Sequence, residues 1–266
     1  MIISRIVSNL TLLIFAVLAT AGSATADDVP QSNDRAAHIK LRGVYGFVAT
    51  GTRGVPFVAV GLFRPEPNGT FHGQAIDNFS GQIVTDTFQG TLTFDSPRTG
   101  TLTGTTSLGA NFGKSFVVTD GGKGIWFEST DSGEVEFIAA TRQVHRRTFT
   151  GRHLSGTWGF ACNGSNANPQ TGVAEPVSAL GTLSWDAVGK FSGRGTYNND
   201  GSIVGATFTG TSTVNSDGTF TNNGDYTTGL QGTFADSGII QTASQLATIS
   251  ISSRGAVACR YRRLPR

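Results

Sequence analysis

The sequence predicts an all-β protein of two tandem, homologous antiparallel β-barrels, each with about eight strands. Three observations support this fold class. The segment LRGVYGF at 41–47 recurs as LSGTWGF at 154–160, which divides the chain into two repeats of the size of a small domain. Short runs of residues alternate between apolar and polar side chains and end at turn signals, as β-strands do. No window repeats apolar residues at the i, i+3, i+4 and i+7 spacing of an amphipathic helix.

Turn sequences such as Asn68-Gly69 and Gly121-Gly122 separate the runs of the first repeat. The predicted strands are 43–50, 55–64, 69–77, 83–95, 99–106, 112–119, 123–130 and 134–143. The second repeat copies them, because glycines and aromatics such as Gly73 and Phe88 recur at an offset of 120. The opening segments are offset by only 113, so the second repeat has seven extra residues around 166–170. Their Asn and Pro content predicts a surface turn.

The chain is expected to be exported. Residues 1–26 have the basic start, the apolar core and the Ala24-Thr25-Ala26 cleavage site of a signal peptide, with an uncleaved anchor as the alternative. Residues 27–40 follow as a flexible lead-in, 41–147 as the first barrel, 148–153 as a linker and 154–266 as the second barrel. No later segment reaches the roughly 20 apolar residues of a membrane span, so we expect a secreted or periplasmic protein.

Strand alternation assigns the side chains that face each barrel lumen. In the first repeat the predicted inward set is apolar and has no group of convergent carboxylates: Tyr45, Phe47, Phe57, Ala59, Gly61, Phe63, Phe88, Gly90, Leu92, Phe94, Ile125 and Phe127. Eight-stranded barrels either fill with side chains or hold one small ligand. The many Phe residues favour filling, and a remaining lumen would suit a small apolar or aromatic molecule.

The two cysteines predict how the second barrel closes. Cys162 lies in the first strand of the second repeat and Cys259 in the last, and an even count in a secreted chain indicates a disulfide. Two unpaired buried thiols are the alternative. A bridge between neighbouring antiparallel strands places Trp158 opposite Arg263, and the repeat transfers this register to Tyr45 and Arg142. First and last strands are then adjacent.

These closing residues carry a family resemblance. Gly156-Thr157-Trp158 with Arg263 resembles the signature of the calycins, which include lipocalins, fatty-acid-binding proteins and avidins. Gly43-Val44-Tyr45 with Arg142 differs by having Tyr in place of Trp. The barrels are also similar to those of allene oxide cyclases. The first resemblance implies a ligand-binding barrel, and the second implies an enzyme built on the same architecture.

No residue is predicted to be catalytic or to bind a cofactor or metal. His38, His72, His145 and His153 lack metal-ligand spacing, and the nucleophile elbow Gly-x-Ser-x-Gly does not occur. Glu134 and Glu136 are expected to be a solvated pair near a turn.

The net charge is only +2, but the cationic side chains are clustered. One cluster lies at the linker and the other at the C-terminus: Arg142, His145, Arg146, Arg147, Arg152 and His153, and Arg254, Arg260, Arg262, Arg263 and Arg266. They could contact anionic polysaccharide, lipid head groups or DNA, or form a solvated linker and tail. Nucleic acid is not expected, because exposed aromatics are not interleaved with the charges.

One outward surface of the first barrel is more apolar than its copy in the second. It comprises Val44, Val48, Val58, Val60, Leu62 and Phe137. A monomer seldom leaves such a patch in water. We therefore expect it to pack on the second barrel, on a second copy of the chain or on another partner.

Together these features predict an exported, non-catalytic protein that binds a small apolar ligand or a protein or cell-surface partner. The alternative is a cyclase or isomerase that shapes an apolar substrate inside a barrel, which requires few catalytic groups.

Overall fold

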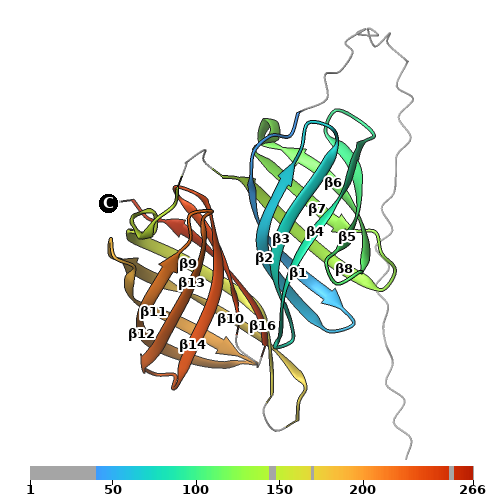
Figure 1. Cartoon of the computed structure of the whole chain (residues 1–266). Coiled ribbons are helices and arrows are strands. Elements are labelled where there is room, and N and C mark those ends of the chain that lie inside the picture. Colours follow the sequence, from blue (N-terminus) through green and yellow to red (C-terminus); the bar gives the residue numbers. More distant parts are fainter. Residues whose placement is uncertain (1–39, 144–147, 169–170, 252–254, 266) are drawn as a thin grey trace, which may run out of the picture. The chain divides into compact units, whose positions relative to one another are not determined.

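The computed structural model describes residues 40–143, 148–168, 171–251 and 255–265, all within one compact unit (Figure 1). The predicted signal peptide and nearly all of the lead-in lie outside these residues. So do His38, His145, Arg146, Arg147, Arg254 and Arg266. Among the described residues, no helix has the length and apolar character required to cross a membrane.

The predicted fold class is confirmed: the described chain forms two closed, eight-stranded antiparallel barrels. The first comprises β1 Tyr45–Arg53, β2 Pro56–Pro65, β3 Thr70–Phe79, β4 Gln82–Phe94, β5 Thr99–Thr106, β6 Asn111–Thr119, β7 Gly124–Ser129 and β8 Glu134–Arg142. The second comprises β9 Gly156–Ala167, β10 Ala174–Trp185, β11 Lys190–Asn199, β12 Ser202–Val214, β13 Thr219–Thr228, β14 Thr233–Thr242, β15 Gln245–Ser250 and β16 Gly255–Arg263. Short 3-10 turns occupy Asp120–Gly122 and Gly151–His153. The strands predicted for the first repeat agree with β1–β8 to within three residues at each end.

Each barrel closes by pairing its first strand with its last. β1 pairs with β8 so that Tyr45 lies opposite Arg142, and β9 pairs with β16 so that Trp158 lies opposite Arg263. The predicted disulfide joins Cys162 to Cys259 across the second of these seams, with the Cα atoms 4.0 Å apart. The second barrel is therefore closed covalently as well as by hydrogen bonds, whereas the first has no cysteine.

The seven extra residues of the second repeat lengthen a hairpin rather than only its turn. β9 and β10 each have 12 residues, compared with 9 and 10 in β1 and β2. Their pairing continues to Ala167 and Ala174, just before the turn. Residues 166 and 167, where the surface turn was expected to begin, are instead paired strand residues.

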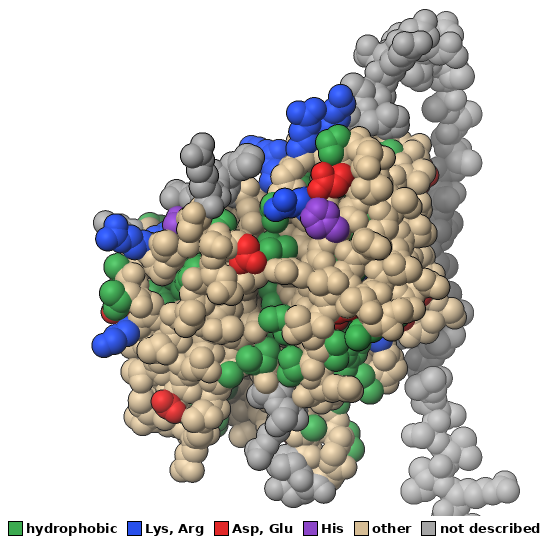
Figure 2. Space-filling model, viewed as in Figure 1, with side chains coloured by type: hydrophobic (Ala, Val, Ile, Leu, Met, Phe, Trp, Pro, Cys, Tyr) green, Lys and Arg blue, Asp and Glu red, His purple; other side chains and the backbone are tan. Residues whose placement is uncertain are grey.

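Inward glycines and phenylalanines fill both lumens in pairs. A Cβ atom built on Gly73 would lie 2.3 Å from the ring of Phe88, and one on the equivalent Gly193 would lie 2.5 Å from Phe208. Each ring therefore occupies the space that a side chain on the neighbouring strand would need. The opposite, outward positions are often Thr or Ser. Accordingly, most of the surface in Figure 2 is neither hydrophobic nor charged.

A third buried cluster joins outward side chains of the two barrels. It contains Val48, Val58 and Val60 of the first barrel and Ile239, Ala247, Ile249, Ala256 and Ala258 of the second. Leu62 is partly buried against it. Polar contacts extend the junction: Asn78 is fully buried and its side-chain amide donates to the carbonyl oxygens of Ser250 and Gly255.

The remaining two residues of the apolar patch do not belong to this cluster. Val44 is half-buried. Phe137 is 44% exposed and packs against the exposed Trp126, with ring centroids 6.1 Å apart. Phe137 lies on β8, and β1 separates β8 from β2. Because the barrel wall curves, Phe137 points away from the cluster.

Arg263 stabilises the closing seam of the second barrel in two ways. Its guanidinium lies 4.6 Å from the centroid of the buried Trp158 ring and donates to the carbonyl oxygens of Ser155 and His153 at 2.7 and 2.9 Å. We expect Arg263→Ala to lower the free energy of unfolding by about 2 kcal/mol, because a cation–π contact and two charge-assisted hydrogen bonds are lost.

Urea denaturation measures this loss. Arg263→Lys should recover only part of it, because an ammonium group cannot stack flat on the ring while bonding both carbonyls. The exposed Arg260, three residues away on the same strand, gives the control variant Arg260→Ala. Equal midpoints for Arg263→Ala and Arg260→Ala would show that the stacked guanidinium adds nothing to stability.

Candidate functional site

One end of the first barrel lumen carries a layer of charged side chains. Successive strands run in opposite directions, so the end of β1 and β3 and the start of β4, β6 and β8 meet at the same rim. The inward positions there are Arg53, Asp77, Asp86, Lys114, Glu134 and Glu136. Below them lies a cavity of about 140 Å³ whose apolar lining includes seven phenylalanines: Phe47, Phe57, Phe63, Phe71, Phe88, Phe112 and Phe127. The site thus has an aromatic floor and a charged mouth.

This layer corrects two expectations from the sequence. The lumen does contain convergent carboxylates, and Glu136 is not solvated but only 3% exposed. The alternation of inward and outward residues along the strands predicts these inward charges. Continuing the inward register from Phe47 leads to Arg53, and continuing it from Ile138 leads back to Glu136.

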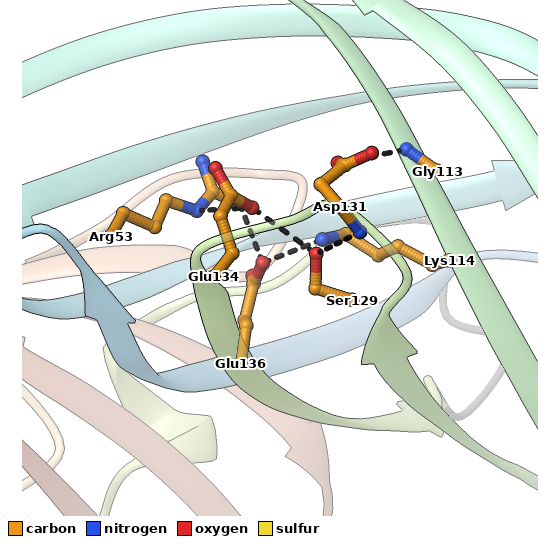
Figure 3. Close-up of polar contacts among 7 residues, drawn as sticks. All are labelled: Arg53, Gly113, Lys114, Ser129, Asp131, Glu134 and Glu136. Carbon is orange, nitrogen blue, oxygen red and sulfur yellow. Dashed lines mark hydrogen bonds and ion pairs between the residues drawn. The ribbon is translucent and has the colours of Figure 1, made fainter.

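Glu136 is the centre of an ion network that Figure 3 shows in close-up. Its carboxylate accepts hydrogen bonds from Lys114 Nζ at 2.5 Å and from Arg53 Nη2 at 2.6 Å. Arg53 Nε lies 3.4 Å from Glu134, and its guanidinium lies 4.4 Å from the Phe57 ring centroid. Because both cations are shared with carboxylates, neither is a free charge at the mouth. Burying such a network carries a desolvation cost that apolar side chains would avoid, so its stability contribution does not explain it.

Further hydrogen bonds position the rest of the rim. Ser129 Oγ donates to Glu134 at 3.2 Å, and Asp131 accepts a hydrogen bond from the Gly113 amide at 3.0 Å (Figure 3). On the other side of the mouth, Asp86 accepts hydrogen bonds from the amide and hydroxyl of Ser107. These bonds tie the β5–β6 and β7–β8 connections to the strands that carry the charges.

Asp77 differs from the other carboxylates because its side chain makes no hydrogen bond to any described residue. Burial raises its pKa to about 7, and the charges of Glu136 and Asp86 act in the same direction, while Arg53 opposes them. Near neutral pH this carboxyl exists in both protonation states. It can donate or accept a proton at the opening of an apolar cavity.

The raised pKa of Asp77 predicts a pH-dependent stability. The folded protein keeps this proton between about pH 4 and 7, where the unfolded chain has lost it, so stability decreases as pH rises through that window. Burial raises the pKa of Asp236 in the second barrel to about 7 as well, which adds to the same slope. We expect a lower free energy of unfolding at pH 8 than at pH 5.

Urea titrations from pH 5 to pH 8 test this expectation. Asp77→Asn should flatten part of the slope, whereas the exposed Asp225→Asn should leave it unchanged. If Asp77→Asn keeps the whole slope of the parent protein, the proton is held elsewhere.

The second barrel lacks this charged layer. The strand register places Asn166, Tyr197, Ala206, Asp236 and Val257 at the positions equivalent to Arg53, Asp77, Asp86, Lys114 and Glu136. Asp236 is instead near tyrosines, and Tyr261 shares a hydrogen bond with Thr248 at 3.2 Å. The two lumens therefore have different chemistry, and the first is the candidate site.

The residues singled out in the sequence lie away from this mouth. Tyr45, at the opposite end of the lumen, donates from its hydroxyl to the Gly122 carbonyl at 2.6 Å, and Arg142 lies opposite it on β8. Trp158, Arg263 and the disulfide belong to the second barrel. Within the described ranges, no group of three or more His, Cys, Asp or Glu side chains is arranged to hold a metal ion.

Comparisons with known proteins do not assign a function to this site. No protein-family model matches the sequence. No curated protein matches it. Among solved structures, a protein of unknown function from the DUF3598 family of Nostoc punctiforme PCC 73102 aligns at 10% identity over 84% of this chain and 96% of its own, with a TM-score of 0.26. That score is too low to support an argument. The resemblance to calycins and allene oxide cyclases reaches no further than the closed antiparallel barrels.

Proposed function

We propose that the protein is an exported binding protein whose first barrel holds one small ligand with an apolar body. The cavity of about 140 Å³ beneath the charged rim is the observation that carries this proposal. An apolar cavity of about 150 Å³ in another protein takes up benzene, so this volume suits a single aromatic ring. Seven phenylalanines would surround that ring.

The rim favours a ligand whose polar group donates hydrogen bonds. Arg53 and Lys114 are both bonded to Glu136 and do not need a further anion. Asp77 has no hydrogen-bond partner among the described residues and lines the same cavity. An amine or hydroxyl on the ring would meet this carboxyl, and an ammonium group would favour its ionised form.

Two measurements test the proposal. Native mass spectrometry of protein purified from its own host should show a retained small molecule. Isothermal titration of the purified full chain should show that benzylamine binds at one site and that toluene, which lacks the polar group, binds more weakly.

Variants separate the floor from the rim. Ala75 is buried and lines the cavity, so Ala75→Leu should fill it and abolish binding of both probes. Ala59→Val makes a smaller version of the same change if Ala75→Leu does not fold. Asp77→Asn should weaken benzylamine about tenfold and leave toluene unchanged, and Asp225→Asn should change neither. The proposal is wrong if benzylamine and toluene both fail to bind and no ligand is retained.

The cyclase or isomerase alternative is favoured by one observation: a carboxyl with a pKa of about 7 faces an apolar cavity. Such a group can act as a general acid or base at neutral pH. If a retained ligand is recovered, incubating it with the protein distinguishes the two functions. A carrier returns the molecule unchanged, whereas an enzyme converts it at a rate that Asp77→Asn lowers about a hundredfold or more.

A further inference from the structure

A second cleft, separate from the lumen, has a strongly cationic lining. Its volume is about 1200 Å³, and residues of both barrels contribute to it. Among the described residues, five basic side chains and one carboxylate, that of Asp120, line it; the basic ones are Arg42, Lys123, Arg142, Arg260 and Arg262. The fold therefore combines part of the linker cluster with part of the C-terminal cluster, although more than a hundred residues separate Arg142 from Arg260 in the sequence.

These cations have no carboxylate partner among the described residues. None of the five forms an ion pair or a side-chain hydrogen bond with another described residue, whereas Arg53, Lys114 and Arg263 all do. Arg42, Lys123, Arg260 and Arg262 are exposed. A concave surface that holds five like charges against one opposite charge concentrates its potential and attracts polyanions.

An exposed aromatic ring stands in the same cleft. Trp126 is 52% exposed, while Trp158 and Trp185 are buried. Phe137 supports one side of the Trp126 ring. A flat, half-exposed indole provides an apolar surface for a ring that carries C–H groups on its face, and adjacent guanidinium groups can bind a carboxylate or sulfate in a bidentate manner.

We propose that this cleft binds an acidic polysaccharide, with one sugar ring on Trp126 and the acidic groups on Arg260, Arg262 and their neighbours. The volume exceeds the 300–1,000 Å³ range of ordinary small-molecule pockets, which suits a segment of a polymer. Single-stranded nucleic acid binding generally uses successive aromatic platforms, and this cleft has one exposed aromatic among its described lining residues.

Tryptophan fluorescence gives a specific test, because Trp126 is the one exposed tryptophan of the three in the chain. Polygalacturonate added to the full chain at low salt should shift the long-wavelength emission to the blue, and dextran, an uncharged polysaccharide, should not. Binding should weaken as salt rises. Trp126→Ala should remove the signal, and isothermal titration should show weaker binding.

Paired charge variants provide the control. Arg260→Ser with Arg262→Ser should weaken polygalacturonate binding about tenfold, as expected for two surface charge contacts. Arg64→Ser with Arg194→Ser removes the same charge from exposed positions outside the cleft and should have little effect. Equal losses in the two double variants, or tighter binding of a single-stranded oligonucleotide than of polygalacturonate, would overturn the proposal. The lumen variant Ala75→Leu should leave polygalacturonate binding intact, so the proposal for the cleft is tested separately from the proposal for the lumen.

Discussion

Replacing both Cys162 and Cys259 with alanine is expected to lower the free energy of unfolding by about 4 kcal/mol. The bridge spans 97 residues, so it removes much of the conformational freedom of the unfolded second repeat. The loss should appear in guanidinium denaturation of the second barrel as a lower midpoint. Cys259 is also buried against the lumen, and the smaller alanine side chain adds a packing loss to the entropic one.

The oxidised and reduced forms of the unmodified protein control for packing. Reduction should produce most of the loss, and peptide mapping without reductant should recover the Cys162–Cys259 linkage. The first barrel offers the converse experiment. Ala49 and Ile138 are directly paired across β1 and β8, at the positions equivalent to the two cysteines. Changing both to cysteine should form a bridge there and raise stability. Equal stability of the reduced and oxidised protein would contradict the assigned role of the bond.

Val60→Lys is expected to destabilise the protein by roughly 3 kcal/mol or more, because it places an ammonium group in an apolar cluster. Val60 is 3% exposed and lies in the cluster with Ile239 and Ile249 of the second barrel. The melting temperature should fall by several degrees.

Val135→Lys is the matched control, since Val135 is 72% exposed on β8 of the same barrel. It should melt close to the parent protein. Size-exclusion chromatography completes the test, because a charge that separates the barrels makes the molecule elute earlier. An unchanged melting temperature and elution volume for Val60→Lys would mean that the two barrels do not depend on this contact.

The fold could be predicted from the sequence because local residue patterns specify the strands and turns, and because both repeats carry these patterns. Alternating apolar and polar residues indicate the strands, and turn residues indicate where the strands end. The repeat supports these assignments, because equivalent positions such as Gly73 and Gly193 carry the same residue. The cysteines then provided the one long-range constraint that identifies which strands close the second barrel. The curvature of the wall cannot be inferred from local patterns, and Phe137 therefore lies two strands away from Val58 rather than in one patch with it.

The candidate site was harder to predict from the sequence because its chemistry depends on side chains that are far apart in the chain. Asp77 follows Ala75 in the same inward register, so its direction could have been predicted. Its raised pKa could not, because that depends on burial and on Glu136, which is 59 residues farther along the chain. Likewise, nothing in the sequence around Lys114 indicates that its side chain is bonded to Glu136, because only the closed barrel brings the two together.

The up-and-down strand order also has a consequence for how the chain folds. In the described strands, every ladder joins neighbours in sequence except β1–β8 and β9–β16. Hairpins can therefore form early and in any order, while each seam must await a strand from the far end of its repeat, which makes closure the slow step. The second seam holds Cys162 and Cys259 side by side, which favours their oxidation, and the bond then prevents that seam from parting. The first barrel has no such lock, so transient opening of the native molecule should begin between β1 and β8, next to the mouth of the cavity.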